Sequence, residues 1–261
     1  MSIFNFDCAI VRRPGRSVIR ALRNGVDEPP SFKDVASEHD AYCSALENAG
    51  LNVDVLPANE TFPDGLFVED PALVFSQGAI LLKSVSDSRA NEVQDLAPTL
   101  REKFDRILSI SDGHVEGGDI LVTPEQVLIG LSKRTDLKGA IALQKCLHAF
   151  GLRSSFTETP KGVLHLKTAC SLLDEETILI TRDLAEDDTF ASFKKLIVPE
   201  EEALAANILR LNDRVLAGQD YPRTLDLIVR HGFTVDPLPT NAINKIDAGL
   251  SCMSLRWRAR G

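Results

Sequence analysis

Short apolar runs, typical of buried strands, alternate along this chain with longer segments in which apolar residues recur every three or four positions, as on one face of a helix. The first part predicts a strand at residues 8–12, a helix at 32–49 that ends before Gly50, and a strand at 51–56. Residues 15–32 contain several Gly and Pro residues, and we interpret this segment as a candidate lid.

From residue 67 onward the same order of elements recurs: strand, turn, strand, helix, strand. The units begin near Phe67, Val115 and Leu164, which are spaced by 48 and 49 residues. The predicted strands lie at 72–75, 79–82, 106–110, 120–122, 127–131, 153–157, 169–173, 177–181, 196–198, 205–211, 214–216, 234–238 and 249–255, and the predicted helices at 88–104, 136–150, 184–195 and 222–231. The last unit has to pair with the N-terminal strand to be complete. A weak repeat of about 45–50 residues is typical of modules arranged radially, with the first strand of each module near the axis.

Polar residues mark the first strands of these units. Glu69 and Asp70 precede one strand, Glu116 another and His165 a third, and Cys252 lies in the last. In a radial array these groups would meet at one central site, whereas in an ordinary layered α/β protein they would stay scattered. The regular spacing favours convergence.

The composition is that of a globular protein of ordinary hydrophobicity. The 261 residues are 44% hydrophobic and 26% charged, so a core can form without disulfides or metals, and we treat residues 1–261 as one catalytic domain. The formal net charge of −9 argues against a nucleic-acid partner and suits a cationic small molecule.

Membrane and secretion signals are not recognisable in the sequence. No apolar run approaches about 18 residues, and the N-terminus lacks the basic and apolar regions of a signal peptide. The five cysteines are odd in number and form no Cys-x-x-Cys pair, which disfavours a disulfide framework and a thiolate zinc site. We therefore expect a cytoplasmic protein with no membrane partner.

Cys252 is the candidate nucleophile. A buried cysteine by itself is more often a small core residue, and a reactive one needs a cation nearby to become a thiolate. His165 lies among apolar neighbours, which is typical of a core histidine, but it is the histidine whose place in the repeat matches that of Cys252. An imidazole there could donate or accept a proton near neutral pH.

The carboxylates around Asp64, Glu69, Asp70 and Glu116 predict a cationic ligand. Acids gathered at one buried site repel each other unless a cation lies between them, and a planar guanidinium matches their geometry. A metal is the rival cation, but the segment His114-x-Glu116-x-x-Asp119 has no strong ligand signature. We therefore expect neither a metal nor a cofactor.

Two arginines could bind the other end of such a ligand. Arg89 begins a predicted helix, and Arg134 lies between a predicted strand and a helix. Either guanidinium could hold a carboxylate with two hydrogen bonds. The residues together indicate a substrate with a guanidinium at one end and a carboxylate at the other, which describes an arginine derivative.

These motifs resemble those of the dimethylarginine dimethylaminohydrolases, a family of the guanidine-modifying pentein superfamily. The resemblance extends in order over nearly the whole chain and rests on Pro63-Asp64, Phe67-Val68-Glu69-Asp70, Glu116-x-Gly118-Asp119, Ser132-x-Arg134-Thr135, Leu164-His165-Leu166-Lys167, Lys245-Ile246-Asp247 and Leu250-Ser251-Cys252-Met253-Ser254. It implies an α/β fold in the form of a five-bladed propeller. It also implies hydrolysis of N-omega-methylated arginines to citrulline and dimethylamine or methylamine, without a cofactor and through a covalent Cys-thiouronium intermediate.

The resemblance also assigns a role to each candidate residue. Cys252 would be the nucleophile and His165 the general acid and base, with Glu116 holding the imidazole. The remaining roles are guanidinium binding by Asp64 and Asp70 with Glu69 close by, carboxylate binding by Arg89 and Arg134, and loop contacts with substrate from Leu22 and the backbone at Ile246.

Two alternatives remain open at this point. A related guanidine hydrolase or deiminase acting on arginine or N-hydroxyarginine would use the same carboxylates, since a methyl group or hydroxyl changes binding by only about 1–3 kcal/mol. A non-catalytic propeller that binds another molecule would not need Cys252, His165 and Glu116 together. The oligomeric state is also open, a homodimer included.

Overall fold

The computed structural model describes residues 3–23 and 28–259, and in these residues fifteen strands form five three-stranded sheets. The sheets are β15-β1-β2, β3-β4-β5, β6-β7-β8, β9-β10-β11 and β12-β13-β14. In each sheet the middle strand pairs antiparallel with the first strand and parallel with the third. The fifteen strands are β1 (Cys8–Arg12), β2 (Asn52–Leu56), β3 (Ala72–Phe75), β4 (Gly78–Leu81), β5 (Ile107–Ser109), β6 (Ile120–Val122), β7 (Val127–Leu131), β8 (Ser154–Glu158), β9 (Cys170–Leu172), β10 (Thr177–Ile180), β11 (Lys194–Ile197), β12 (Leu209–Leu211), β13 (Arg214–Gly218), β14 (Thr234–Leu238) and β15 (Ser254–Trp257).

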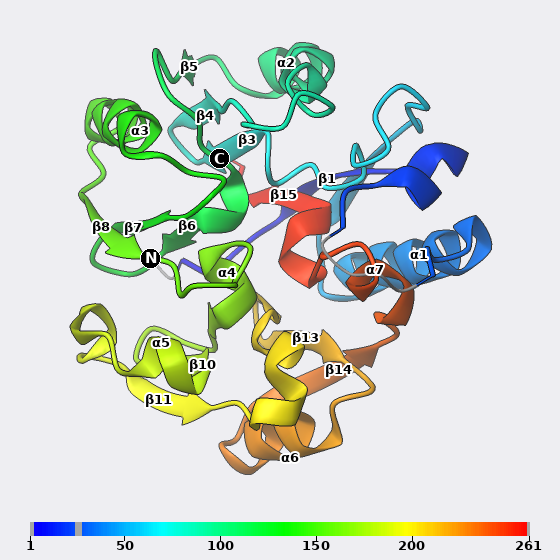
Figure 1. The fold of residues 1–261 in the computed structure, drawn as a ribbon, viewed down its shortest axis with the longest axis vertical. Coiled ribbons are helices and arrows are strands. Elements are labelled where there is room, and N and C mark those ends of the chain that lie inside the picture. The colour runs from blue at the N-terminus through cyan, green and yellow to red at the C-terminus, as the bar shows by residue number, and fades with distance from the viewer. Residues whose placement is uncertain (1–2, 24–27, 260–261) are drawn as a thin grey trace.

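The sheets are arranged around a common centre, with the longer helices at the rim (Figure 1). These helices are α1 (Phe32–Asn48), α2 (Glu92–Lys103), α3 (Leu137–Ala149) and α6 (Pro222–Arg230), and the short ones are α4 (Leu166–Ala169), α5 (Arg182–Ala185) and α7 (Asn241–Asn244). Pairing of β1 with β15 brings the two ends of the chain into one sheet and closes the ring. None of the helices in the described ranges combines the length and apolarity that a bilayer crossing requires.

The core consists of five apolar clusters, one at each boundary between neighbouring sheets. Successive side chains of a strand point to opposite faces, so a middle strand supplies two clusters at once. In β4, Ala79 and Leu81 face the cluster shared with the β15-β1-β2 sheet, whereas Ile80 faces the β6-β7-β8 sheet. This double burial explains why the middle strands are continuous apolar runs rather than alternating ones.

Most predicted elements are confirmed, several with the same bounds, but the predicted helix at 184–195 is wrong. The chain there forms α5, a 3-10 turn η3 (Asp188–Phe190), and then β11, which pairs with β10. The side chain of Asp187 accepts a hydrogen bond from the backbone N–H of Thr189. Such local bonds compete with the helix and favour a turn.

The turns before the inner strands also differ from the prediction. The segments expected as strands at 205–211 and 249–255 begin as 3-10 turns, η4 (Glu200–Ala206) and η5 (Leu250–Met253), and become strands only at β12 and β15. Cys252 therefore lies in a tight turn rather than in the middle of a strand. The inner strands approach one another across modules, β15 next to β3 and β9 next to β12, so the turns that precede them are brought together.

One buried contact anchors α7, which leads toward Cys252. The carboxylate of Glu38, on α1, accepts hydrogen bonds from the backbone N–H groups of Ala242 and Ile243 at 2.8 and 2.9 Å. Because Glu38 is buried, its removal leaves both N–H groups without a partner in the protein.

We predict that Glu38→Ala lowers the free energy of unfolding by about 2–4 kcal/mol, since each buried donor left unsatisfied costs about 1–3 kcal/mol. Urea unfolding of the variant measures this loss. The matched control is Glu47→Ala on the exposed side of the same helix, which should change stability by less than about 0.5 kcal/mol. Equal losses in the two variants would contradict the prediction.

Candidate active site

The predicted site residues, Glu69 excepted, line one pocket at the centre of the ring. The pocket is formed by Leu22, Asp64, Phe67, Asp70, Arg89, Glu116, Arg134, Leu164, His165, Ile246, Asp247, Ala248 and Cys252. The expected lid at 15–32 contributes Leu22, whereas its residues 24–27 lie outside the described part of the chain. The convergence expected from the repeat is therefore present in the structure.

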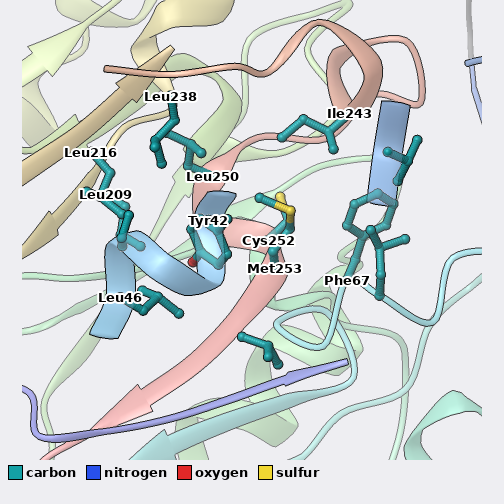
Figure 2. Close-up of a cluster of buried hydrophobic side chains, with 14 of the residues drawn as sticks. Tyr42, Leu46, Phe67, Leu209, Leu216, Leu238, Ile243, Leu250, Cys252 and Met253 are labelled. Carbon is teal, nitrogen blue, oxygen red and sulfur yellow. The ribbon is translucent and has the colours of Figure 1, made fainter. Parts of the chain in front are cut away.

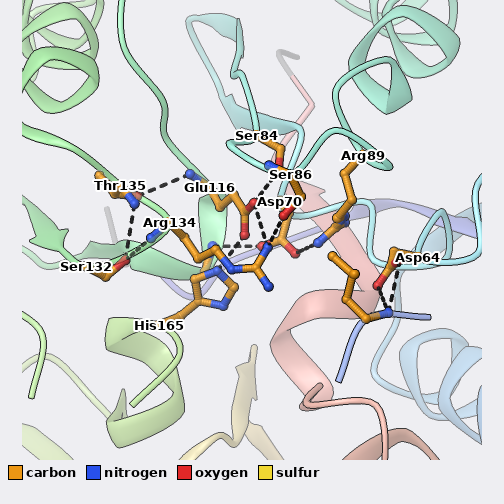
Figure 3. Close-up of polar contacts among 12 residues, drawn as sticks. Asp64, Asp70, Ser84, Ser86, Arg89, Glu116, Ser132, Arg134, Thr135 and His165 are labelled. Atoms are coloured by element: carbon orange, nitrogen blue, oxygen red, sulfur yellow. Dashed lines mark hydrogen bonds and ion pairs between the residues drawn. The ribbon is translucent and has the colours of Figure 1, made fainter. Parts of the chain in front are cut away.

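His165 and Glu116 form the central ion pair of the pocket. The imidazole Nε2–H of His165 donates to Oε2 of Glu116 at 2.8 Å, and both side chains are almost fully buried (Figure 3). Although burial opposes a charged imidazole, the carboxylates of Asp70, Glu116 and Asp119 raise the pKa of His165 above its usual value. Burial likewise opposes ionisation of Glu116, but the hydrogen bond from His165 holds the pKa of Glu116 below its usual value.

The turn that carries His165 is anchored by a hydrogen bond to the carboxylate of Asp119. His165 precedes α4, and the first N–H of this helix, from Leu166, donates to Asp119 at 2.9 Å. Asp119 also accepts from the hydroxyls of Ser132 and Thr135, both at 2.7 Å, and so ties the loop of Arg134 to the same turn.

Gly118 makes room for the imidazole ring. A Cβ at this position would lie 2.6 Å from Cγ of His165, which is closer than real side chains approach. The backbone N–H of Gly118 also donates a hydrogen bond to Asp70 at 3.1 Å, so this glycine contacts both the imidazole of His165 and one of the acids of the pocket.

Cys252 is enclosed by apolar side chains on one side and by acids on the other. It belongs to the cluster of α1, η5 and the β12-β13-β14 sheet, near Phe67, Ile243 and Met253 (Figure 2). Burial, followed by the charges of Asp70 and Glu69, raises the pKa of the Cys252 thiol to about 12. The thiol is therefore protonated at neutral pH unless a cation enters the pocket.

Asp64 is the acid of the pocket that most needs a cation. Its carboxylate accepts hydrogen bonds from the N–H of Leu22 at 3.1 and 3.3 Å, and burial raises its pKa. Among the residues that the structure describes, no basic side chain lies within ion-pair distance of it. Asp70 differs, because Arg89 lies 2.6 Å from its carboxylate, and this guanidinium holds the pKa of Asp70 below its usual value although burial opposes it.

The two arginines differ in how fully they are engaged. Arg89 is buried, and it bonds Asp70 through Nη1 and Glu92 through Nε and Nη2. Arg134 is more exposed, and its Nη1 donates to Ser86 at 2.6 Å and more weakly to Glu116 at 3.4 Å (Figure 3). Arg134 is therefore the side chain that can turn toward an anion at low cost.

The structure separates Glu69 from the other predicted residues. Its carboxylate pairs with Lys167 at 2.6 Å and Arg256 at 3.1 Å, and it lines a different cavity of about 870 Å³. The backbone N–H of Glu69 donates to the carbonyl of Cys252 at 3.2 Å. Glu69 is thus a charge beside the turn of Cys252 and does not line the pocket. Its two basic partners, Lys167 and Arg256, could not be predicted from the sequence.

Within residues 3–23 and 28–259, one group of side chains could ligate a metal ion. Ligand atoms of Asp70, Glu116 and His165 lie within 4.8 Å of one another. Arg89 already pairs with Asp70, and the hydroxyl of Ser84 donates to Glu116, so the charges and lone pairs of this group are largely satisfied by protein groups. The set His114, Glu116 and Asp119 is not assembled, because His114 pairs with Asp136 on the surface.

Sequence reasoning missed the two serines of the segment after β4. Ser84 donates to Glu116, and Ser86 accepts from Arg134, so the segment orients both charged side chains. Serines in a loop carry no distinguishing pattern in one sequence, and only the fold shows what they contact.

Comparison with known proteins gives a family and close structural relatives. The model of the family "N,N dimethylarginine dimethylhydrolase, eukaryotic" matches residues 24–212. The N(G),N(G)-dimethylarginine dimethylaminohydrolase of Pseudomonas aeruginosa is 36% identical over 256 residues, which cover 97% of this chain and 100% of that protein.

Two solved structures of this enzyme type superpose closely on the chain. One is the enzyme from Pseudomonas aeruginosa, as a cysteine-to-serine mutant complexed with citrulline, with a TM-score of 0.94 and 35% identity, covering 97% of this chain and 100% of that one. The other is a dimethylarginine dimethylaminohydrolase with a histidine-to-glycine mutation, as an adduct with S-methyl-L-thiocitrulline. Its TM-score is 0.93 at 35% identity, and the match covers 96% of this chain and 99% of that one.

We predict that Gly118→Ala displaces the imidazole of His165, because the added methyl group and the ring cannot both keep their places. Loss of the contact with Glu116 should lower the pKa of His165 toward or below its usual value, as measured by NMR titration of the ring protons.

The matched control is Gly50→Ala. That glycine has a φ of +91° and open space around it, so the variant costs about 1 kcal/mol of backbone strain without touching the pocket. A His165 pKa equal to wild type in the Gly118 variant would contradict the steric argument.

Proposed function

Because the chain belongs to the dimethylarginine dimethylaminohydrolase family, we propose that it hydrolyses N-omega-methylated arginines to citrulline and dimethylamine or methylamine. The observation that carries the proposal is a buried carboxylate without a cation, Asp64, in the same pocket as a thiol and a charged imidazole pair. A guanidinium supplies the missing positive charge and carries the carbon that a thiolate attacks.

The architecture that we propose is a five-bladed α/β propeller formed by one catalytic domain over residues 1–261. Five sheets with the same strand order around one centre support it, as does the pairing of β1 with β15. The small-molecule site would then lie where the inner turns meet, and the blades would act as a rigid frame around it.

Recognition of the guanidinium would fall to Asp64 and Asp70. Asp64 has no basic side chain within ion-pair distance among the described residues, so a guanidinium can pair with it directly. Asp70 already shares Arg89, so its second contact is weaker but directs the ligand toward Cys252.

The amino-acid end of the substrate would be bound by Arg134, Arg89, Leu22 and the backbone at Ile246. The pocket holds only about 20 Å³ of free space, enough for a water molecule, so side chains must move to admit an arginine derivative. Arg134 can exchange its bond with Ser86 for a substrate carboxylate. Arg89 would have to exchange Glu92, a partner of the same chemistry.

The first chemical step would form a bond between sulfur and carbon. The bound guanidinium offsets the acids that keep the Cys252 thiol protonated, so the thiol releases its proton to solvent. The thiolate then attacks the central carbon to give a tetrahedral adduct. His165 then donates its proton to the methylated nitrogen. The carbon–nitrogen bond breaks, and dimethylamine leaves as a neutral amine.

The second step would release the product. His165, now neutral, takes a proton from water, and the hydroxide attacks the carbon of the thiouronium. The carbon–sulfur bond of this second adduct breaks and the proton of its hydroxyl group passes to the departing sulfur. Citrulline leaves, and the Cys252 thiol and the protonated His165 are restored. Glu116 keeps the imidazole oriented in both steps through the contact of 2.8 Å.

We predict that the wild-type protein converts asymmetric dimethylarginine to citrulline and shows a covalent adduct on Cys252 after rapid acid quenching, as measured by mass spectrometry. Cys252→Ala should abolish both signals, because no other side chain in the pocket is a comparable nucleophile.

Cys43→Ala, a change at a cysteine outside the pocket, should keep both turnover and adduct. Parallel assays with arginine and N-hydroxyarginine separate this function from the related guanidine hydrolases. Faster turnover of either than of the methylated forms would overturn the substrate assignment, and no turnover of any of them would favour a binding protein.

The ion pair predicts a pH dependence. Burial opposes the charge of His165, but its carboxylate neighbours, Glu116 among them, raise its pKa, so protonated His165 persists to higher pH than an ordinary histidine. Glu116→Gln should lower this pKa. Since the leaving group needs a protonated imidazole, the limb of kcat that falls as pH rises should move to lower pH, and kcat should fall about 10²–10⁴-fold.

Steady-state kinetics across the pH range measure both effects. Glu38→Gln, at another buried acid that does not line the pocket, should leave the position of this limb unchanged. An unshifted limb in the Glu116 variant would show that Glu116 does not control the protonation of His165.

A further inference from the structure

We propose that Asn207 is a positioning residue that joins the turn of the nucleophile to the turn of the general acid. This inference rests on the proposed function, because it assigns those two roles to Cys252 and His165. Asn207 itself does not line the pocket.

The side-chain amide of Asn207 bonds both turns at once. Its Nδ2 donates to the carbonyl of Lys167 at 2.9 Å and to the hydroxyl of Ser251 at 3.1 Å. Its Oδ1 accepts from the backbone N–H of Ser251 at 3.1 Å. Lys167 is two residues after His165, and Ser251 directly precedes Cys252, so one rigid, planar amide spans the two turns.

The position of Asn207 in its module matches that of other site residues. Asp70, Asn207 and Cys252 each lie two residues before an inner strand, which begin at Ala72, Leu209 and Ser254. The fourth module provided no candidate in the sequence. By this correspondence Asn207 is the residue of the fourth module that matches Asp70 and Cys252. Its side chain bonds neighbouring turns and does not line the pocket.

The turn of Cys252 is shaped to receive this amide. Gly249 directly precedes η5, and a Cβ at this position would lie 2.3 Å from Cγ and Oδ1 of Asn207. The absence of a side chain lets the amide lie directly against the backbone of the turn. Asn207 is 9% exposed, so water does not readily replace its hydrogen bonds.

The physical consequence is a fixed separation between sulfur and imidazole. His165 belongs to the third module and Cys252 to the fifth, and neither pairs with the other through its own sheet. A bridge from the fourth module prevents the two turns from moving independently. Displacement of reacting groups by about 1 Å can reduce a rate about 10²-fold, so loss of the bridge should act on the chemical step.

The test compares Asn207→Ala and Asn207→Asp with wild type. We expect Asn207→Ala to lower kcat about 10–100-fold while KM changes less than about threefold, since the residue does not touch the pocket. Asn207→Asp retains an acceptor for Ser251 but loses the donor to Lys167 and adds a negative charge beside the residue that precedes Cys252. The pH at which iodoacetamide alkylates Cys252 should therefore rise in this variant.

The matched control is Asn59→Ala. The amide of Asn59 likewise donates to one group, Asp95, and accepts from a backbone N–H, that of Thr61, but it lies away from the pocket. Thermal unfolding of each variant corrects for lost stability, and kcat of the Asn59 variant should match wild type.

Wild-type kcat and an unshifted alkylation profile in the folded Asn207 variants would overturn the proposal. A loss of kcat explained by the unfolded fraction alone would do so as well. Alkylation of Cys252 needs no substrate, so the profile still tests Asn207 if methylated arginines are not turned over. The two ideas can therefore fail separately.

Discussion

A histidine excluded from water keeps a proton only if carboxylates lie against it, and the contact between His165 and Glu116 is the interaction on which the rest of the site depends. Burial alone would leave the imidazole neutral, and the three acids near it reverse this preference. Burial, followed by the charges of Asp70 and Glu69, disfavours the thiolate of Cys252. The resting pocket thus holds a protonated His165 and an uncharged Cys252 thiol. A cationic ligand would favour the thiolate of Cys252 while His165 keeps its proton.

The arrangement of charges explains how such a pocket can exist in a stable protein. Arg89 offsets Asp70 and Glu92, Arg134 lies beside Glu116, and Glu69 is offset by Lys167 and Arg256. Paired in this way, buried charges avoid most of the cost of leaving water. Among the described residues, Asp64 has no basic side chain within ion-pair distance, and burial raises its pKa although Arg89 and the N–H of Leu22 favour its charge. The acid most in need of a cation therefore lies where a ligand would bind.

The scaffold and the site are built from different parts of each module. Middle strands are buried on both faces and hold neighbouring sheets together, whereas the polar side chains lie in short turns before the inner strands. The backbone N–H groups of a turn are not all used in strand pairing, and its side chains are not packed between sheets. A turn can therefore form hydrogen bonds with the turn of a neighbouring module. Asp119 and Asn207 illustrate this, since each accepts or donates to turns of other modules.

Amino-acid patterns alone were enough to predict most local elements, the repeat, the family resemblance and the candidate residues Cys252, His165, Asp64 and Asp70. Strand and helix periodicity is a local property, so bounds such as those of β3, β6 and β14 could be predicted, whereas the helix at 184–195 was lost to local hydrogen bonds of Asp187.

Which of the candidates share a pocket depends on how the modules pack together, and this could not be predicted from the sequence. Glu69 is next to Asp70 in the chain, but its carboxylate pairs with Lys167 and Arg256. Asn207 forms hydrogen bonds with turns that lie about 40 residues away on either side in the sequence. These partners meet because five sheets close into a ring, and the pKa shifts follow from the burial and charge that closure creates. Neither the contacts between modules nor the burial of each side chain can be predicted from the order of residues in the chain.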